Sequence, residues 1–135
     1  MNVANYLEQH TTIATQISII KKLVQSNDLE KNAGEIALHI NALAGKITIH
    51  LSMEDKYLYP RLIESKNLEV QKLAERYQKE MGSLAENFVR YKDKYNTGLK
   101  ILGNRNELVS DTDFIFNAIE KRVEREEKEL YKLID

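Results

Sequence analysis

Two histidines and two glutamates are the residues of this sequence that could do chemistry together. His50 and Glu54 are four residues apart, so on a helix they lie on neighbouring turns of one face. His10 and Glu126 stand in two other segments, each within a pattern of apolar residues that would face a core. Imidazole and carboxylate groups suit iron, manganese or zinc as ligands. The spacing of His50 and Glu54 is therefore compatible with a shared metal ion.

The two glutamates need a compensating partner if both are buried. A carboxylate in an apolar core costs several kcal/mol when it lacks a cation or hydrogen-bond donors. Three kinds of compensation are open for Glu54 and Glu126: a metal ion, protonation with a raised pKa, or the guanidinium of Arg122. Arg122 precedes Glu126 by about one helical turn.

The elements that must position these residues are helices. One Pro and five Gly among 135 residues, with apolar residues at steps of three and four, predict helix over most of the chain and no strand. Breaks at residues 26–28, 65–67 and 96–98 divide the pattern. Pro60 is expected to bend or end the second helix. The predicted fold is an all-α, antiparallel up-down-up-down four-helix bundle, with residues 1–135 as one domain.

The last helix needs a separate start signal, because residues 99–109 form a connector with room for a short helix. Ser110 with Asp113 has the spacing of a capping box, which predicts that the fourth helix opens there. Residue counts from the predicted turns place polar residues of all four helices at similar heights, at ~1.5 Å per residue. One core layer is expected to contain His10, His50, Glu54, Tyr77, Met81 and Glu126, and the apolar stripe of the second helix continues to Tyr57.

Composition excludes several classes of function. The absence of cysteine excludes disulfides, thiolate zinc sites, iron–sulfur ligation and thiol nucleophiles. The net charge is -1, from 20 basic and 21 acidic residues, so the composition does not indicate a basic surface that would bind nucleic acid or an anionic membrane. There is no apolar run of ~20 residues and no signal-like N-terminus, so we expect a cytoplasmic protein. A serine elbow and a Gly-rich phosphate loop are also absent, so we do not expect an enzyme.

Residues 50–60, HLSMEDKYLYP, resemble the His-x-x-x-Glu segment with an apolar-aromatic-Pro tail of hemerythrin-like, or HHE, metal-binding domains. A first-helix histidine, His10, and a second copy of the tail pattern in residues 122–131 support the resemblance, which covers almost the whole chain. The resemblance implies that His10 and His50 hold an iron ion. It also implies that Glu54 and Glu126 correspond to the family's two bridging carboxylates.

The sequence departs from the family where a second iron would bind. Tyr77, Met81 and Arg122 stand where the family has histidines. The resemblance therefore implies an incomplete site for one iron, or another divalent metal, that binds or senses oxygen or nitric oxide, or has a redox or iron-related regulatory role. We hypothesise that Arg122 replaces the charge of the second ion and bridges the two glutamates. Tyr77 and Glu80 are secondary candidates for an extra ligand, and Arg122 could instead pair with acids at the surface.

Two other functions are considered. The main alternative is a metal-free four-helix bundle that acts as a protein-interaction module, as a homodimer or with an unknown protein partner. A histidine phosphotransfer domain would need a solvent-facing His-x-x-Lys-Gly pattern, which follows neither His39 nor His50. His39 lies eleven residues before His50, ~16 Å away along a helix, too far to share an ion. We therefore expect His39 to have a structural role.

Overall fold

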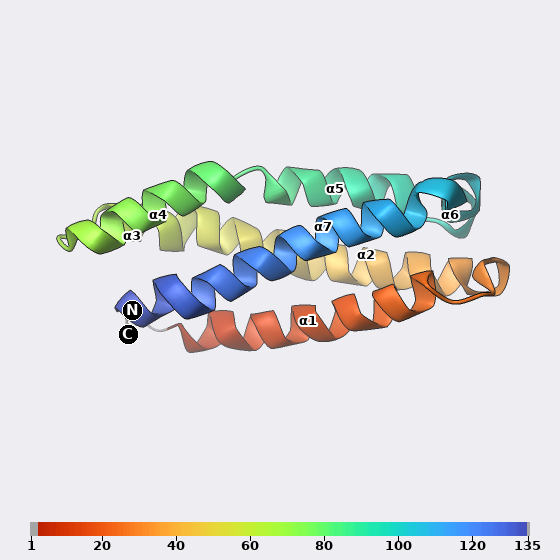
Figure 1. Ribbon diagram of the computed structural model, residues 1–135, viewed down its shortest axis with the longest axis horizontal. Coiled ribbons are helices and arrows are strands. Elements are labelled where there is room, and N and C mark those ends of the chain that lie inside the picture. The colour runs from red at the N-terminus through yellow and green to blue at the C-terminus, as the bar shows by residue number, and fades with distance from the viewer. Residues whose placement is uncertain (1–2, 135) are drawn as a thin grey trace.

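The long helices of the chain run antiparallel in a bundle of four arms (Figure 1). The structure is a computed structural model that describes residues 3–134, apart from the side chains of Met81 and Ile134, so the predicted core position of Met81 lies outside the described part. The elements are α1 (Ala4–Val24); α2 (Leu29–Met53), η1 (Glu54–Leu58) and α3 (Tyr59–Ile63); α4 (Leu68–Met81) and α5 (Leu84–Tyr95); α6 (Gly98–Gly103); and α7 (Arg105–Arg125), η2 (Glu126–Leu130) and α8 (Tyr131–Ile134).

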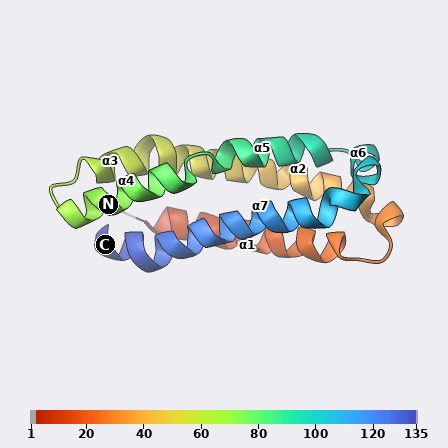
Figure 2. The same cartoon turned by 45° about the horizontal axis from the view of Figure 1, so that its top comes forward.

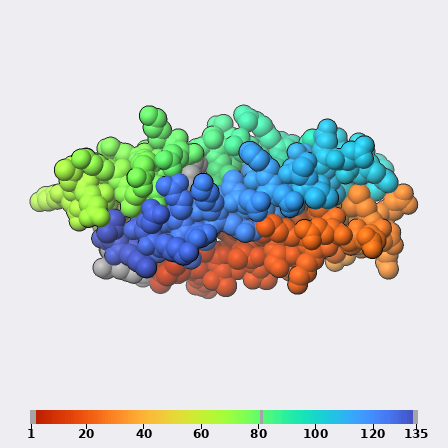
Figure 3. Space-filling model, viewed as in Figure 1, coloured from red at the N-terminus to blue at the C-terminus, as the bar shows by residue number. Residues whose placement is uncertain are grey.

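The arms alternate in direction and close into a ring. α1 packs against α2 and α7, and α5 packs against the same two helices. Figure 2 shows both termini at one end of the bundle, and Figure 3 shows the last arm lying against α1 along one face. The prediction of an all-α, up-down-up-down bundle is confirmed. Among residues 3–134, no helix has the length and apolar character needed to cross a bilayer.

The three predicted breaks occur where they were expected, because polar side chains begin the next helix. Asp28 accepts a hydrogen bond from the Lys31 N–H at 3.2 Å at the start of α2. Asn67 accepts one from the Glu69 N–H at 3.0 Å at the start of α4. Thr97 does the same for the Lys100 N–H at 3.1 Å at the start of α6. Each bond satisfies a backbone donor that the first helical turn leaves unpaired.

Two predicted features of the arms are wrong. α7 begins at Arg105, so Ser110 is inside the helix, where its hydroxyl donates to the carbonyl of Glu107 at 3.2 Å. A serine inside a helix can bond back to a carbonyl of the preceding turn in this way. The third arm is also divided at Gly82, where an added Cβ would lie 2.6 Å from the Gln78 carbonyl oxygen. Glycine permits that close backbone approach.

The arms that carry Glu54 and Glu126 each contain one π-helical turn. In η1 the N–H of Tyr59 bonds to the carbonyl of Glu54, five residues earlier. The arm continues through Pro60, which lies at the start of α3, where a missing N–H costs little. Pro60 therefore does not end the helix. Tyr57 is 68% exposed, contrary to its predicted place on the stripe, because the wider turn brings Tyr59 to the core instead.

A layer of buried polar residues separates two apolar clusters. The larger cluster spans α1, α2, α5 and α7, and the smaller one contains Leu58, Leu62, Val70 and Leu130 at the end that holds the termini. Between them along the arms lie His10, His50, Glu54, Arg122 and Glu126, each at most 2% exposed. The polar layer of the bundle therefore contains the four residues that the sequence singled out.

Candidate metal centre

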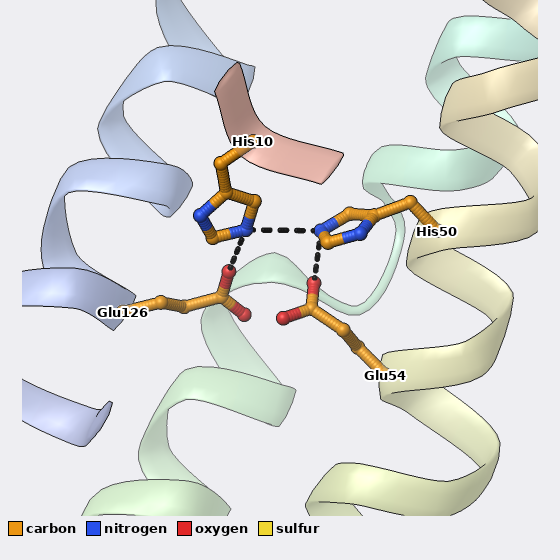
Figure 4. A group of neighbouring side chains, drawn as sticks. All are labelled: His10, His50, Glu54 and Glu126. Carbon is orange, nitrogen blue, oxygen red and sulfur yellow. Dashed lines mark hydrogen bonds and ion pairs between the residues drawn. The ribbon is translucent and has the colours of Figure 1, made fainter. Parts of the chain in front are cut away.

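His10, His50, Glu54 and Glu126 converge on one point inside the bundle (Figure 4). The two Nε2 atoms are 3.0 Å apart. His50 Nε2 lies 3.1 Å from Glu54 Oε1, and His10 Nε2 lies 3.4 Å from Glu126 Oε1. One ligand atom from each residue lies within 4.8 Å of the others. The structure thus brings together donors from α1, α2, η1 and η2.

Polar neighbours orient both imidazole rings through their Nδ1 atoms. The Nδ1 of His10 lies 3.1 Å from a carboxylate oxygen of Glu127, and the Nδ1 of His50 is hydrogen-bonded to Oε1 of Gln9. Carboxylate and amide oxygens only accept hydrogen bonds, so each Nδ1 is the N–H donor. A neutral ring then presents the bare lone pair of Nε2 to the centre of the cluster. This arrangement is the usual one for histidines that bind metals.

The atoms that face one another in this centre are acceptors. With both Nδ1 atoms protonated, the two Nε2 lone pairs point at each other and at carboxylate oxygens. Among the described residues, none donates a hydrogen bond to the buried Oε1 of Glu126. Acceptors at these separations repel unless a metal ion or a proton lies among them. The donor set of two imidazoles and two carboxylates therefore fits a divalent transition metal.

The pKa shifts of the buried groups indicate which of them hold protons when no metal ion is bound. Burial, together with the charge of Glu54, raises the pKa of Glu126 to about 7. Burial by itself would lower the pKa of His10, but Glu126 and Glu54 outweigh it, so the pKa rises. Burial and the neighbouring His10 lower the pKa of His50 to about 4. Without a metal ion, the centre holds protons on the Glu126 and His10 side.

Two tyrosines complete the centre in a crossed arrangement. The Tyr131 hydroxyl donates to Oε2 of Glu54 at 2.7 Å, and the Tyr59 hydroxyl donates to Oε2 of Glu126 at 2.6 Å. Each tyrosine follows a glutamate by five residues through a π-helical turn, and each reaches the glutamate of the other arm. The sequence analysis missed both tyrosines. The signal was the shared pattern Glu-acid-Lys-x-Leu-Tyr in residues 54–59 and 126–131.

Arg122 lies buried beside the two glutamates and not at the surface. Its Nη2 is 3.4 Å from Glu54 Oε1 and 2.9 Å from Asp55 Oδ1, and its Nε is 3.4 Å from Glu126 Oε2. Burial would lower the pKa of Arg122, but Glu126 and Glu54 raise it, so the guanidinium stays charged. The contacts to Glu54 and Glu126 are those expected from the sequence. Asp55, a third acidic partner, was not anticipated.

The other titratable residues considered from the sequence are directed elsewhere. The Tyr77 hydroxyl donates to Glu129 and to the backbone carbonyl of Arg125 at 3.5 Å. Glu80 is exposed and paired with Arg125 at 2.8 Å. The described cluster of histidine and acidic ligands does not include Glu80, and an additional ligand at Tyr77 or Glu80 stays a prediction. His39 is partly exposed and lies 3.7 Å from Glu35.

The comparisons with known proteins bear on this centre directly. The model of the hemerythrin HHE cation-binding domain matches residues 1–134, which confirms the resemblance seen in the sequence. The comparison with curated proteins gives no match, and neither does the comparison with solved structures.

Proposed function

This chain belongs to the hemerythrin HHE cation-binding domain family, and we propose that it binds one divalent transition-metal ion, iron above all. His10 and His50 provide Nε2 ligands, and Glu54 and Glu126 provide one carboxylate oxygen each. The observation that carries the proposal is the convergence of these four buried groups within 4.8 Å. A proton on one ring nitrogen satisfies one neighbouring acceptor, whereas a metal ion contacts all four ligands at once.

The ligand set suits a small-molecule sensor. An iron ion with two imidazoles and carboxylate ligands retains open coordination positions, at which a small molecule such as oxygen or nitric oxide can bind. Each of the four residues is at most 2% exposed, which favours a diatomic ligand over a larger substrate. A groove of about 420 Å³ along α1 and α2 is lined by Gln9 and His50, and we propose that a small ligand approaches the centre from this side. We propose a binding and sensing role, without catalysis.

Replacing either histidine tests the metal proposal. His10→Ala and His50→Ala are expected to lose stoichiometric iron after anaerobic loading with Fe(II) and removal of excess metal, because each removes a ligand at the centre. His39→Ala is the matched control, since His39 contacts Glu35 outside the centre, and it should retain one ion per chain. Elemental analysis gives the readout. Unchanged iron content in both ligand variants would overturn the proposal.

The sensing proposal needs a separate measurement. Addition of nitric oxide to the iron-loaded wild type should change its visible absorption spectrum, and the same addition to His50→Ala should not. An unchanged spectrum in the wild type would contradict nitric oxide binding while leaving metal binding intact. A wild-type chain without stoichiometric metal would instead favour the alternative of a metal-free interaction module.

A further inference from the structure

The guanidinium of Arg122 lies among three carboxylates, those of Glu54, Asp55 and Glu126. Glu54 and Glu126 each contact it at 3.4 Å, and Asp55 contacts it at 2.9 Å. Arg122 is 2% exposed, and Asp55 is 28% exposed, at the edge of the layer. Carboxylate oxygens surround a hard metal ion in the same way. In this chain the positive charge among the three carboxylates belongs to an arginine side chain.

Each oxygen of the two glutamates already has a neighbour. Oε1 of Glu54 lies near both His50 and Arg122, and Oε1 of Glu126 lies near His10. Both Oε2 atoms accept a hydrogen bond from Tyr59 or Tyr131, and Oε2 of Glu126 also contacts Arg122. The guanidinium and the two hydroxyls therefore contact the carboxylate oxygens that a second ion would need.

The charges of the layer balance with one divalent ion. Glu54, Asp55 and Glu126 carry three negative charges when ionised, and Arg122 carries one positive charge. One divalent ion beside the histidines brings the sum to zero. A second divalent ion would leave two uncompensated positive charges in the buried layer and would lie against the guanidinium, which is unfavourable in a low-dielectric interior.

We infer that Arg122, supported by Tyr59 and Tyr131, restricts this centre to one metal ion, and that a neutral residue at position 122 opens a second divalent cation site. The second site consists of Glu54, Asp55 and Glu126. It is an all-oxygen site, which suits Mn(II) or Fe(II). This inference rests on the proposed binding of one ion by the histidines and glutamates. Arg122 acts through the carboxylates that it holds, so it is a positioning residue.

Equilibrium dialysis against Mn(II), with metal measured per chain, tests the inference. The wild type should bind one ion and Arg122→Gln two. Arg125→Gln is the matched control, because Arg125 lies on the same helix but pairs with the exposed Glu80, and it should bind one. Arg122→Lys keeps the charge and should also bind one. The double variant R122Q/D55N removes an oxygen ligand of the new site and should return to one.

The outcomes separate the inference from the proposed function. One ion or none in Arg122→Gln, with one in the wild type, would overturn the inference and leave the proposed function standing. Two ions in R122Q/D55N would also overturn it, because the second ion would then bind elsewhere. A wild type that binds no ion would overturn the proposed function itself. If Arg122→Gln folds only when Mn(II) is present, stoichiometry is measured on protein refolded in Mn(II), with the same two ions expected.

Discussion

At the scale of the residue, the two histidines of this centre differ in what holds them. A carboxylate, Glu127, accepts the Nδ1–H of His10, whereas an amide oxygen, that of Gln9, accepts the Nδ1–H of His50. A carboxylate partner increases the basicity of a ligating imidazole and fixes its orientation. His10 is therefore expected to be the stronger ligand, although Glu127 is 40% exposed and contacts no metal itself.

Replacing the carboxylate partner should weaken metal binding without removing a ligand. Glu127→Gln is expected to lower the affinity for Fe(II) or Mn(II) about 10- to 100-fold, the usual effect of losing such a partner. Glu124→Gln is the control, because Glu124 is exposed and pairs with Lys128 one turn away. Calorimetric titration of both variants checks the prediction. Equal affinities in the two variants would show that Glu127 does not support the centre.

The metal-free centre loses its bound protons between pH 6.5 and 8, and the folded chain should become less stable over this range. Glu126 has a pKa of about 7 when folded and an ordinary value of 4.5, so the folded chain binds more protons in this range. Its stability is therefore lost as the pH rises through 7, by on the order of 1 kcal/mol. The raised pKa of His10 acts in the same direction, whereas the lowered pKa of His50, about 4 against an ordinary value of 6.5, opposes it, mostly below pH 6.5.

Thermal unfolding in chelator at pH 6.5 and pH 8 measures this effect. The metal-free wild type should melt at a lower temperature at pH 8, and Glu126→Gln should show a smaller difference. Metal binding should show the opposite trend, because the ion displaces protons and binds more tightly as the pH rises. A metal-free protein that became more stable from pH 6.5 to 8 would contradict the described charge state of the centre.

At the scale of the element, the two π-helical turns explain which site residues the sequence did not reveal. Tyr59 and Tyr131 each follow a glutamate by five residues, a spacing that an α-helix places off the core face. An α-helical stripe predicts Tyr57 in the core instead. The wider turn of a π-helix, with its i→i+5 hydrogen bond, brings the tyrosine at i+5 onto the same face as the glutamate at i. Such turns occur often at functional sites.

Deleting one residue from η1 should convert the π turn into α-helix without misplacing the centre. The deletion of Lys56, which is exposed, is expected to keep the helical circular dichroism signal and one bound ion, because Tyr59 then follows Glu54 by four residues, and an α-helix places residues four apart on one face. The substitution Lys56→Ala removes the same side chain with the π turn intact and should also retain one ion. Loss of metal binding in the deletion variant alone would show that the centre requires the π turn itself.

The elements that could be predicted are those that side-chain chemistry determines locally. The breaks at Asp28, Asn67 and Thr97 were predictable because each residue caps the following helix. The break at Gly82 was not, because it depends on a close backbone contact with Gln78 that no local pattern records. The start of α7 was misplaced because Ser110 has the spacing of a cap but occupies a helix interior.

At the scale of the whole molecule, the bundle holds the polar layer between two apolar clusters. The convergence of His10, His50, Glu54 and Glu126 was predictable because helical rise and three turns determine their heights. The contact of Arg122 with Asp55 and the crossed tyrosines depend on side-chain directions across arms, which residue counts do not provide. A bound ion should therefore connect the first, second and fourth arms, and stabilise the folded chain by mass action.

The most direct test of the metal centre is to locate the ion in a crystal grown with Mn(II), using anomalous diffraction from manganese. One anomalous peak per chain is expected, in contact with Nε2 of His10 and His50 and with a carboxylate oxygen of Glu54 and of Glu126. No peak at saturating Mn(II), or a single peak away from the two Nε2 atoms, would contradict the account.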